Sequence, residues 1–292
     1  MPVDQEIDSR NKNIQIYING SFYHRNEAKI SVYDSGFLMG DGIWEGLRLI
    51  NDKWIFIDEH IDRLFEGCKA IDIDIKMTKK DIVNALDETK AINNMSNEVH
   101  ARLMITRGNK SKPFQQPHLS ENGINIVIIM EHSKPSIDVK NITMATVPQV
   151  RGMPMSQDPK LNSHSKLNCI LACIQANKLG ADEALMLDPL GFVNTTNSCN
   201  FFIVKNNQVW TSTGDYCMNG VTRQNIINLC NENAIPIYEK NFSLVDVYSA
   251  DEAFITGTLG SLTNVTCIDN RTIGNDNNPI SDKLRNYYKK LL

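Results

Sequence analysis

Residues 42–71 spell GIWEGLRLINDKWIFIDEHIDRLFEGCKAI, and this stretch decides the fold of the first half of the chain. Its first part, residues 42–57, predicts two strands joined by a tight turn at Asn51 and Asp52, a common hairpin signal. From residue 58 to residue 71, apolar side chains recur at helical spacing, with Asp58 as a plausible N-cap. A hairpin followed directly by a helix indicates a domain that mixes strands and helices.

The flanking segments extend this pattern. Residues 14–23 predict another hairpin, and residues 98–108 and 124–132 predict two more strands, so residues 1–132 are expected to form an α+β domain. Residues 133–141 are polar and contain proline, which marks a linker. A second domain, residues 142–292, is predicted to begin with a strand at residues 142–147.

Two helices are predicted in the second domain. The first covers residues 165–180, with Ser165 as its cap and Gly180 as its stop. Its apolar residues lie on one face, namely Leu167, Ile170, Leu171 and Ile174. The second helix covers residues 222–234 and is expected to be capped by Thr222. Strands are predicted in EALMLD, NFFIV, QVWTST and EAFITG, and the small-residue segment TGTLGSLTNV is expected to form a loop.

Composition limits the possible functions. The chain has 292 residues, enough for two domains, with 41% hydrophobic and 22% charged residues and a net charge of −4. No basic block predicts a nucleic-acid partner, and no apolar run predicts a membrane span. The polar, acidic start of the sequence does not resemble a signal peptide. A cytoplasmic protein is therefore expected.

The seven cysteines are scattered and odd in number, which fits reduced thiols. Cys169 and Cys173 lie four residues apart on a predicted helix, a spacing that two metal ligands could use. Free cysteine is also among the most buried residue types, so packing of two small side chains is the simpler interpretation. No metal site is predicted.

Two segments have the character of anion sites. NGVTRQNII (219–227) places a glycine and a threonine at a helix start, where backbone N–H groups and the helix dipole favour a phosphate. TGTLGSLT (256–263) follows a strand with small residues that let backbone N–H groups approach a ligand. Arg63 could add a charge for the same anion, or remain a solvated helix arginine.

Taken together, these stretches resemble the class IV aminotransferases. The motifs are GDGIWEGLRL, FIDEHIDRLFEGCKAI, TRG, GADEALMLDPLGFV, NFFIV, NGVTRQNII and EAFITGT, in family order. The family includes branched-chain aminotransferases, D-amino acid aminotransferases and aminodeoxychorismate lyase. The resemblance implies a two-domain fold type IV enzyme that holds pyridoxal 5'-phosphate between its domains, and at least a homodimer.

The resemblance also assigns cofactor contacts residue by residue. Arg63 matches the phosphate arginine, Val221 and Thr222 match the donors at the helix start, and Thr258 matches a further phosphate ligand. Met218 matches the apolar residue that packs on the cofactor ring. The anion sites inferred from the residues and those implied by the family therefore coincide.

The family's Schiff-base lysine is not at its expected place. Aligned without gaps, DPKLNSHSKLN (158–168) puts Asn162 at the lysine position and Lys166 at the position of a tyrosine that points at the cofactor. We hypothesise that Lys166 bonds the cofactor and shuttles the proton, while His164 and Asn162 shape the site. Lys160 is the competitor, and a third alternative is that no lysine reaches the cofactor.

A second departure concerns the cofactor's ring nitrogen. The family places a glutamate there, and GFVNT (191–195) puts Thr195 at that position. A carboxylate would hold a proton on the nitrogen, whereas a hydroxyl can only hydrogen-bond, most simply by donating to an unprotonated nitrogen. The expected consequence is a weaker electron sink.

The substrate side mixes features of two subfamilies. Arg107 matches the substrate-carboxylate arginine of D-amino acid aminotransferases, and Arg48 ends a motif like that of branched-chain enzymes. Trp44 occupies an aromatic pocket position, and Leu259 and Gly260 could offer backbone N–H groups to a carboxylate. Core packing for Trp44 and a structural ion pair for Arg48 are the simpler alternatives.

The expected function is amino-group transfer between an amino acid and a 2-oxo acid. One alternative keeps the cofactor but catalyses a lyase reaction. The other is a family member that has lost Schiff-base chemistry and acts as a binding protein or a cofactor-independent enzyme.

Overall fold

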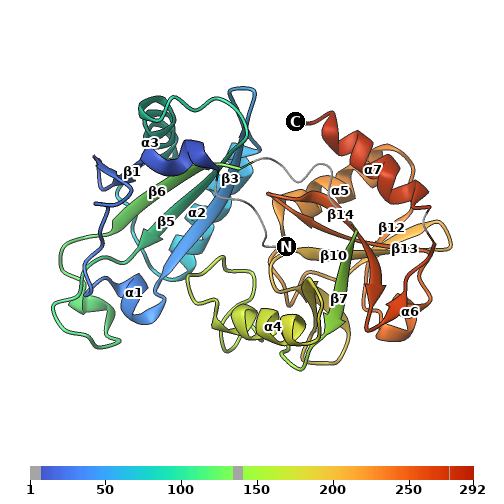
Figure 1. The fold of residues 1–292 in the computed structure, drawn as a ribbon. Helices are drawn as coiled ribbons and strands as arrows, with labels where there is room; N and C mark the ends of the chain where they lie inside the picture. The colour runs from blue at the N-terminus through green and yellow to red at the C-terminus, as the bar shows by residue number, and fades with distance from the viewer. Residues whose placement is uncertain (1–7, 134–140, 276) are drawn as a thin grey trace. The chain divides into compact units, whose positions relative to one another are not determined.

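The computed structural model describes residues 8–133, 141–275 and 277–292. These residues divide into two compact units; in Figure 1 the first is drawn mostly in blue to green and the second mostly in light green to red. The N-terminal unit contains residues 8–133 and also 162–166; the C-terminal unit contains residues 141–161 and the rest of the chain from 167. The predicted linker, 133–141, falls almost wholly outside the described residues.

The N-terminal unit is built on a six-stranded antiparallel sheet in the order β2-β1-β6-β5-β3-β4. The strands are β1 (Gln15–Ile18), β2 (Ser21–His24), β3 (Gly42–Ile50), β4 (Lys53–Ile55), β5 (Val99–Thr106) and β6 (Asn125–His132). The helices are α1 (Ser35–Met39), α2 (Ile57–Ala70) and α3 (Lys79–Ile92), with short 3-10 turns η1 (Ser9–Asn13) and η2 (Pro117–Leu119). Both predicted hairpins are present.

Alternation along β3 separates two faces of this sheet. Ile43, Leu47 and Leu49 are buried and belong to the face on which α2 packs, while Trp44 and Arg48 belong to the opposite face. The predicted helix after β4 is α2, but its N-cap is Phe56 in a left-handed conformation, not Asp58. Asp58 lies in the first turn of α2, where the positive end of the helix dipole stabilises its negative charge.

The C-terminal unit contains a nine-stranded mixed sheet in which β9 pairs with both β8 and β10, so six strands close into a ring. The strands are β7 (Ile142–Thr146), β8 (Glu183–Leu187), β9 (Val193–Thr196), β10 (Asn200–Lys205), β11 (Gln208–Thr211), β12 (Ile237–Glu239), β13 (Glu252–Gly257), β14 (Ser261–Ile268) and β15 (Arg271–Thr272). The helices are α4 (Leu167–Lys178), α5 (Val221–Glu232), α6 (Leu244–Tyr248) and α7 (Pro279–Lys289).

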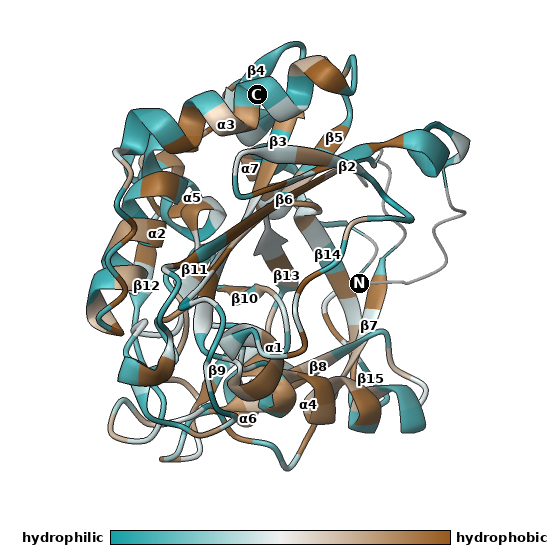
Figure 2. Ribbon diagram, turned by 90° about the vertical axis from the view of Figure 1, so that its left-hand side faces the viewer, coloured by the Kyte–Doolittle hydropathy of each residue, from teal (hydrophilic) through white to brown (hydrophobic). Residues whose placement is uncertain are grey.

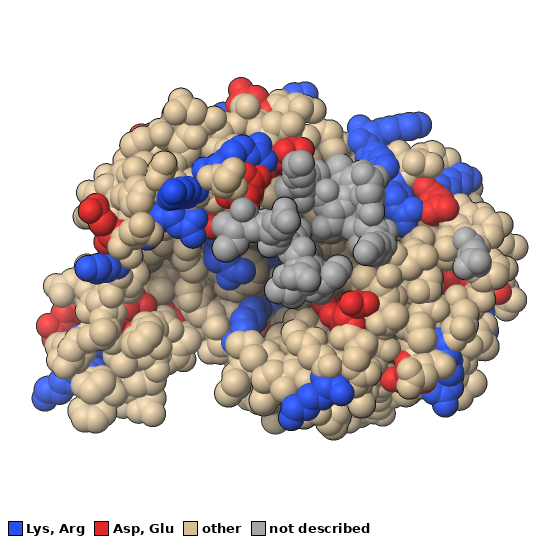
Figure 3. Space-filling view, in the orientation of Figure 1, with Lys and Arg blue, Asp and Glu red and all other residues tan. Residues whose placement is uncertain are grey.

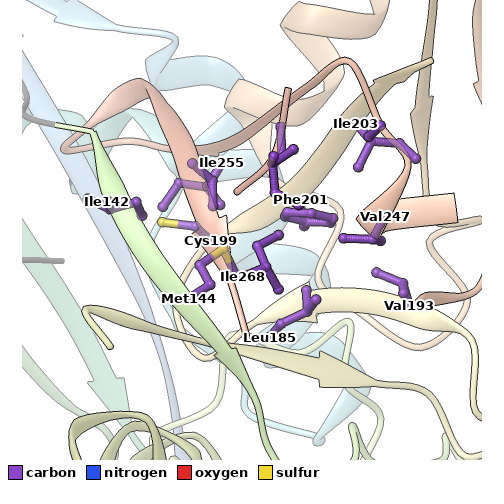
Figure 4. Packing of buried hydrophobic residues seen from close by; sticks show 14 of the residues in the cluster. Ile142, Met144, Leu185, Val193, Cys199, Phe201, Ile203, Val247, Ile255 and Ile268 are labelled. Atoms are coloured by element: carbon purple, nitrogen blue, oxygen red, sulfur yellow. The ribbon is translucent and has the colours of Figure 1, made fainter. Parts of the chain in front are cut away.

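The core of this unit fills the space between its strands. Figure 4 shows side chains of β7, β8, β10, β13 and β14 pointing toward one another around Phe201, which has no exposed surface. Because Phe201 and Ile203 take this side of β10, Asn200 and Phe202 must point to the other side. Phe202 stacks there on Phe254 of β13, with ring centroids 4.9 Å apart.

Three predictions about this unit need correction. Gly220, not Thr222, is the N-cap of α5, and Thr222 lies in the first turn. The segment TGTLGSLTNV is a loop only at residues 258–260, because β14 begins at Ser261 and pairs back onto β13. Ser165 does not belong to α4; its hydroxyl donates to the Gly40 carbonyl. Gly180 follows α4 with φ of +75°, as a helix stop requires.

The apolar row on α4 faces away from the core. Ala172 and Ala176 have no exposed surface and pack against β8, whereas Leu167, Ile170, Leu171 and Ile174 are 41–67% exposed. The hydropathy colouring of α4 in Figure 2 shows how apolar this helix is. The helix is held to the core through its small residues, which allow a close approach to the sheet.

Candidate functional site

In the C-terminal unit, Asn200 brings several of the predicted cofactor residues together. It begins β10 and lies directly opposite Thr195 of β9 on one side and Thr256 of β13 on the other. Its side-chain amide donates to the Met218 carbonyl at 2.9 Å. A Cβ added to Gly220 would lie 2.4 Å from Asn200 Oδ1, so the helix start approaches Asn200 as closely as only glycine allows.

The start of α5 has the character of an anion site. Its N-cap is a glycine, so no cap side chain takes up the first backbone N–H groups of Val221 and Thr222. Thr222 is buried, and its hydroxyl lies 3.5 Å from the Tyr288 hydroxyl of α7. Thr256 is also buried, and its hydroxyl has no hydrogen-bond partner within the described part of the chain. Free N–H groups, a helix dipole and an unused hydroxyl suit a phosphate group.

Thr258, Leu259 and Gly260 form the three-residue turn between β13 and β14. They follow Thr256 directly, so the turn extends from the same strand that carries the unused hydroxyl. The structure therefore brings Thr195, Met218, Val221 and Thr222 around Asn200. These residues fit a phosphorylated cofactor.

The Thr195 hydroxyl donates its hydrogen to the Cys199 carbonyl at 2.7 Å, inside the protein. The same carbonyl also accepts from Thr196 N. In this conformation Thr195 has only lone pairs to offer a ligand. The prediction that Thr195 donates to an unprotonated ring nitrogen is therefore corrected: the hydroxyl can accept from a protonated nitrogen but does not donate.

In the N-terminal unit, the segment 162–166 extends the edge of β3. Trp44 N donates to the Asn162 carbonyl at 3.0 Å and His164 N donates to the Gly42 carbonyl at 2.9 Å, an antiparallel pairing with Ser163 opposite Ile43. Ser163 therefore shares the α2 face with Ile43. Asn162 and His164 fall on the other face, the one that carries Trp44.

Lys166 ends this segment close to Trp44. It is half-buried, and its Nζ lies 5.6 Å from the centre of the Trp44 ring. His164 Nε2 is buried and has no hydrogen-bond partner among the described residues. Burial lowers the pKa of His164, so its imidazole is neutral near pH 7. A neutral nitrogen without a partner can accept a proton.

Asn162, at the position of the family lysine, is 4% exposed, and its Oδ1 has no hydrogen-bond partner within the described part of the chain. Lys160, the competitor, is exposed, and its backbone N–H donates to the Asp158 carboxylate in a local turn. The structure therefore gives Lys166 the more enclosed surroundings of the two lysines.

The same face carries two arginines without ion-pair partners in the described chain. Arg48 is 3% exposed; its Nη1 donates to the Ser133 carbonyl at 3.0 Å, and its Nη2 is unpaired. The Arg102 guanidinium carbon lies over the Trp44 ring, 3.9 Å from its centre. Burial lowers the pKa of Arg48 to about 10 and that of Arg102 below its ordinary value, yet both stay charged at neutral pH. Such a face favours carboxylates.

Arg102 and His100 were missed by the sequence interpretation. The pairing of β3 with β5 places Arg102 opposite Gly46 and His100 opposite Arg48, so both lie beside Trp44 and Arg48. The alternation of polar side chains in VHARLMIT (99–106) is the signal that could have found them.

Arg107 has a structural role. Its Nε and Nη2 bind the Asp41 carboxylate at 2.7 and 3.0 Å. Its guanidinium also donates to the carbonyls of Ile71 and Asp72 at the end of α2. These bonds use four of its five hydrogens, so the substrate contact that the resemblance implies for Arg107 stays a prediction that the structure does not support.

Arg63 lies on α2 and pairs with Glu45 of β3. It is therefore on the α2 side of the sheet, opposite to Trp44. No group of histidine, cysteine and carboxylate side chains in the described chain could hold a metal ion, and Cys169 and Cys173 are free thiols. Cys169 accepts a hydrogen bond from Arg151 Nη1.

Comparison with known proteins defines the class. The model of amino-transferase class IV matches residues 42–268. The D-alanine aminotransferase of Listeria innocua is 30% identical over 285 residues, which cover 94% of this chain and 95% of that protein. The chain therefore belongs to the class IV aminotransferase family.

Two further relatives place it within the family. The branched-chain-amino-acid aminotransferase-like protein 2 of Arabidopsis thaliana is 36% identical over 96% of this chain. The chain spans about half the length of that relative, 51%. The crystal structure of the branched-chain aminotransferase of the archaeon Thermoproteus uzoniensis with norvaline has the same fold, with a TM-score of 0.87 and 26% identity. The match covers 95% of this chain and 94% of that one.

The surface carries charged side chains of both signs, in agreement with the small net charge of −4. On the described parts of the face shown in Figure 3, lysine and arginine side chains lie among aspartate and glutamate side chains. None of the helices in the described chain is both long and apolar enough to span a bilayer.

Proposed function

We propose that this protein is a pyridoxal 5'-phosphate-dependent aminotransferase that moves an amino group between an amino acid and a 2-oxo acid. The observation that carries the proposal is the uncapped start of α5 beside Asn200, where the residues assigned to the cofactor gather. When bound, the cofactor supplies an electron sink for the carbon that exchanges its amino group.

The C-terminal unit would hold the phosphate. Val221 N and Thr222 offer donors at the positive end of the α5 dipole, and Thr258 with the unused Thr256 hydroxyl offers donors from β13 and its turn. Met218, fixed through its carbonyl by Asn200, would pack on the ring. Thr195 would accept a hydrogen bond from the ring nitrogen without the charge of a carboxylate, which predicts slow transamination.

The N-terminal unit would supply the amine and bind the substrate. Lys166 Nζ would carry and transfer the proton, and the neutral His164 Nε2 would accept a proton from it. Arg102 and the unpaired Nη2 of Arg48 would bind the carboxylates of an amino acid or 2-oxo acid, and Trp44 would bound the pocket. Two arginines suit a substrate with two carboxylates as well as one.

A cofactor titration tests the proposal. The purified protein with added pyridoxal 5'-phosphate is expected to turn yellow, and borohydride should abolish the colour and fix the cofactor to one peptide. Mapping that peptide distinguishes Lys166 from Lys160. Lys166→Ala should prevent fixation, and Lys160→Ala, the matched control, should leave it unchanged.

One observation favours a second candidate. Asn162 stands buried at the family's lysine position with an unpaired Oδ1, as expected if the old amine site had been replaced by a hydrogen-bonding group. In that case the protein would bind a phosphorylated ligand without forming a bond to it. Binding of the cofactor with no borohydride-fixed peptide would support this candidate over the aminotransferase.

We also propose that the protein is a homodimer, as the family resemblance implies, and that it is cytoplasmic, which its free cysteines favour. Light scattering of the eluting protein at several concentrations tests the oligomeric state. A single monomer mass at all concentrations would contradict the dimer.

A further inference from the structure

Tyr288 is a buried phenol that reaches the start of α5. It lies on α7, which packs against α5 (Figure 1), and only 3% of it is exposed. Its hydroxyl lies 3.5 Å from the hydroxyl of Thr222, in the first turn of α5. Both residues belong to the C-terminal unit. Tyr288 therefore meets the candidate phosphate site through one of the residues assigned to it.

The helix that carries Tyr288 is fixed to the two strands beside that site. At the start of α7, Ser281 donates from its backbone N–H and its hydroxyl to the Glu252 carboxylate of β13, at 2.8 and 2.6 Å. One turn before Tyr288, Arg285 Nη2 donates to Asn264 Oδ1 of β14 at 2.6 Å. Strands β13 and β14 flank the three-residue turn at 258–260. The phenol is thus held in one place relative to this turn.

The Thr222 hydroxyl is not used by its own helix. A threonine inside a helix often donates to the carbonyl one turn earlier, as Thr89 of α3 does. For Thr222 the carbonyl four residues earlier is that of Met218, which already accepts from a side-chain amide. In the described part of the chain, the Thr222 side chain makes no hydrogen bond other than the one with Tyr288. Its capacity for a ligand therefore depends on this contact.

The direction of the contact follows from the chemistry of the phenol. Burial raises the pKa of Tyr288 more than the contact with Thr222 lowers it, so the phenol keeps its hydrogen at neutral pH. It can therefore donate to Thr222 Oγ and leave the Thr222 hydrogen for an anion. Two hydroxyls in series strengthen each other's hydrogen bonds. We expect the 3.5 Å separation to shorten toward about 2.8 Å when an anion accepts from Thr222.

We propose that Tyr288 is a positioning residue that directs the Thr222 hydroxyl toward the phosphate group of the cofactor. This inference rests on the proposed function, in which Thr222 binds that phosphate at the start of α5. Tyr288 does not touch the ligand itself. A hydroxyl that is already oriented binds an anion more tightly, because it has less rotational freedom to lose.

Selectivity for the phosphate tests this role. Tyr288→Phe removes one oxygen and keeps the packing of the ring. We expect the Kd of pyridoxal 5'-phosphate to rise about threefold to tenfold, and the Kd of pyridoxal, which has no phosphate, to change less than about twofold. Tyr287→Phe, at the neighbouring half-buried tyrosine of α7, is the matched control and should leave both values unchanged.

A double-mutant cycle assigns the effect to Thr222. Thr222→Val keeps the shape of the side chain but removes the hydroxyl, and it should also weaken binding of pyridoxal 5'-phosphate. Adding Tyr288→Phe to this variant should change the Kd by less than about twofold, because the phenol then has no hydroxyl to direct. If Thr222→Val fails to fold, Thr222→Ala serves the same comparison.

The proposed function and the positioning role fail in different ways. If the unmodified protein does not prefer pyridoxal 5'-phosphate to pyridoxal, the proposed phosphate site is wrong. If it does, but Tyr288→Phe retains the full preference, the positioning role is wrong. Equal weakening of both ligands by Tyr288→Phe, or an equal effect with and without the Thr222 hydroxyl, would show that Tyr288 only stabilises the fold, and either result overturns the inference.

Discussion

At the residue scale, His100 reports on the surroundings of the buried Arg48. It lies opposite Arg48 on the paired strand, and burial, with a smaller contribution from the Arg48 and Arg102 charges, lowers its pKa to about 4. The native protein therefore keeps this imidazole neutral where an unfolded chain would protonate it. Near the buried Arg48, limited access of water strengthens the attraction between that arginine and a carboxylate, whereas Arg102 on the same face is exposed to solvent.

This pKa predicts how stability depends on pH. Because the folded pKa lies below the unfolded value of about 6.5, the contribution of neutral His100 is complete above pH 6.5. It is lost as pH falls from about 6.5 toward 4. We expect His100→Gln to remove about 1–3 kcal/mol of this pH dependence, measured by urea unfolding at pH 7.5 and pH 4.5. If the free energy of unfolding changes between pH 7.5 and pH 4.5 by the same amount in the variant as in the unmodified protein, the assignment to His100 is wrong.

At the element scale, α4 is held by small residues and presents its large ones outward. Ala172 and Ala176 have no exposed surface, while Ile170 is 52% exposed. The apolar row was visible in the sequence, but the side that meets the sheet is set by how closely β8 approaches the helix. Alanine permits that approach and a larger side chain does not.

Two substitutions on α4 test this orientation. Ala172→Leu should overpack the contact with β8 and lower the free energy of unfolding by about 1–3 kcal/mol. Ile170→Ser, the matched control on the opposite face, should change the free energy by less than about 0.5 kcal/mol. Denaturant unfolding of both variants at the same protein concentration gives the comparison. A larger loss for Ile170→Ser would mean that the helix is rotated.

At the scale of the whole molecule, the chain does not divide at one linker. Residues 162–166 belong to the N-terminal unit although both neighbouring segments belong to the C-terminal unit. The predicted boundary, residues 1–132 followed by 142–292, therefore omits the segment that completes the edge of β3. The same five residues carry the candidate amine and its neighbours.

Breaking this pairing should affect the N-terminal unit. His164→Pro removes the N–H that donates to the Gly42 carbonyl. We expect this change to lower the free energy of unfolding of the N-terminal unit by about 1–3 kcal/mol. His164→Ala keeps the N–H and serves as the control. Hydrogen exchange at the Trp44 amide should accelerate in the proline variant only. Equal rates in both variants would show that the pairing does not hold β3.

Most elements of the fold followed from the sequence, because alternation, helical spacing and turn residues act over a few neighbours. The hairpin at Asn51 and Asp52 and the stop at Gly180 are examples, since both need left-handed backbone that these residues adopt readily. The family motifs located the start of α5. Helix caps were less predictable: phenylalanine is not a preferred N-cap residue, yet Phe56 occupies the N-cap position of α2 in a left-handed conformation.

The sequence by itself determined the family and most of the elements, and it pointed to a candidate anion site at the start of α5, since each depends on local pattern or motif order. Only the tertiary structure decided that Asn200 links Thr195 to the α5 start, that Arg102 stacks on Trp44, and that the Arg107 guanidinium is already occupied. These facts depend on strand register and on partners far apart in the chain. No local pattern encodes such pairings, because the free energy that fixes them comes from packing distant segments together.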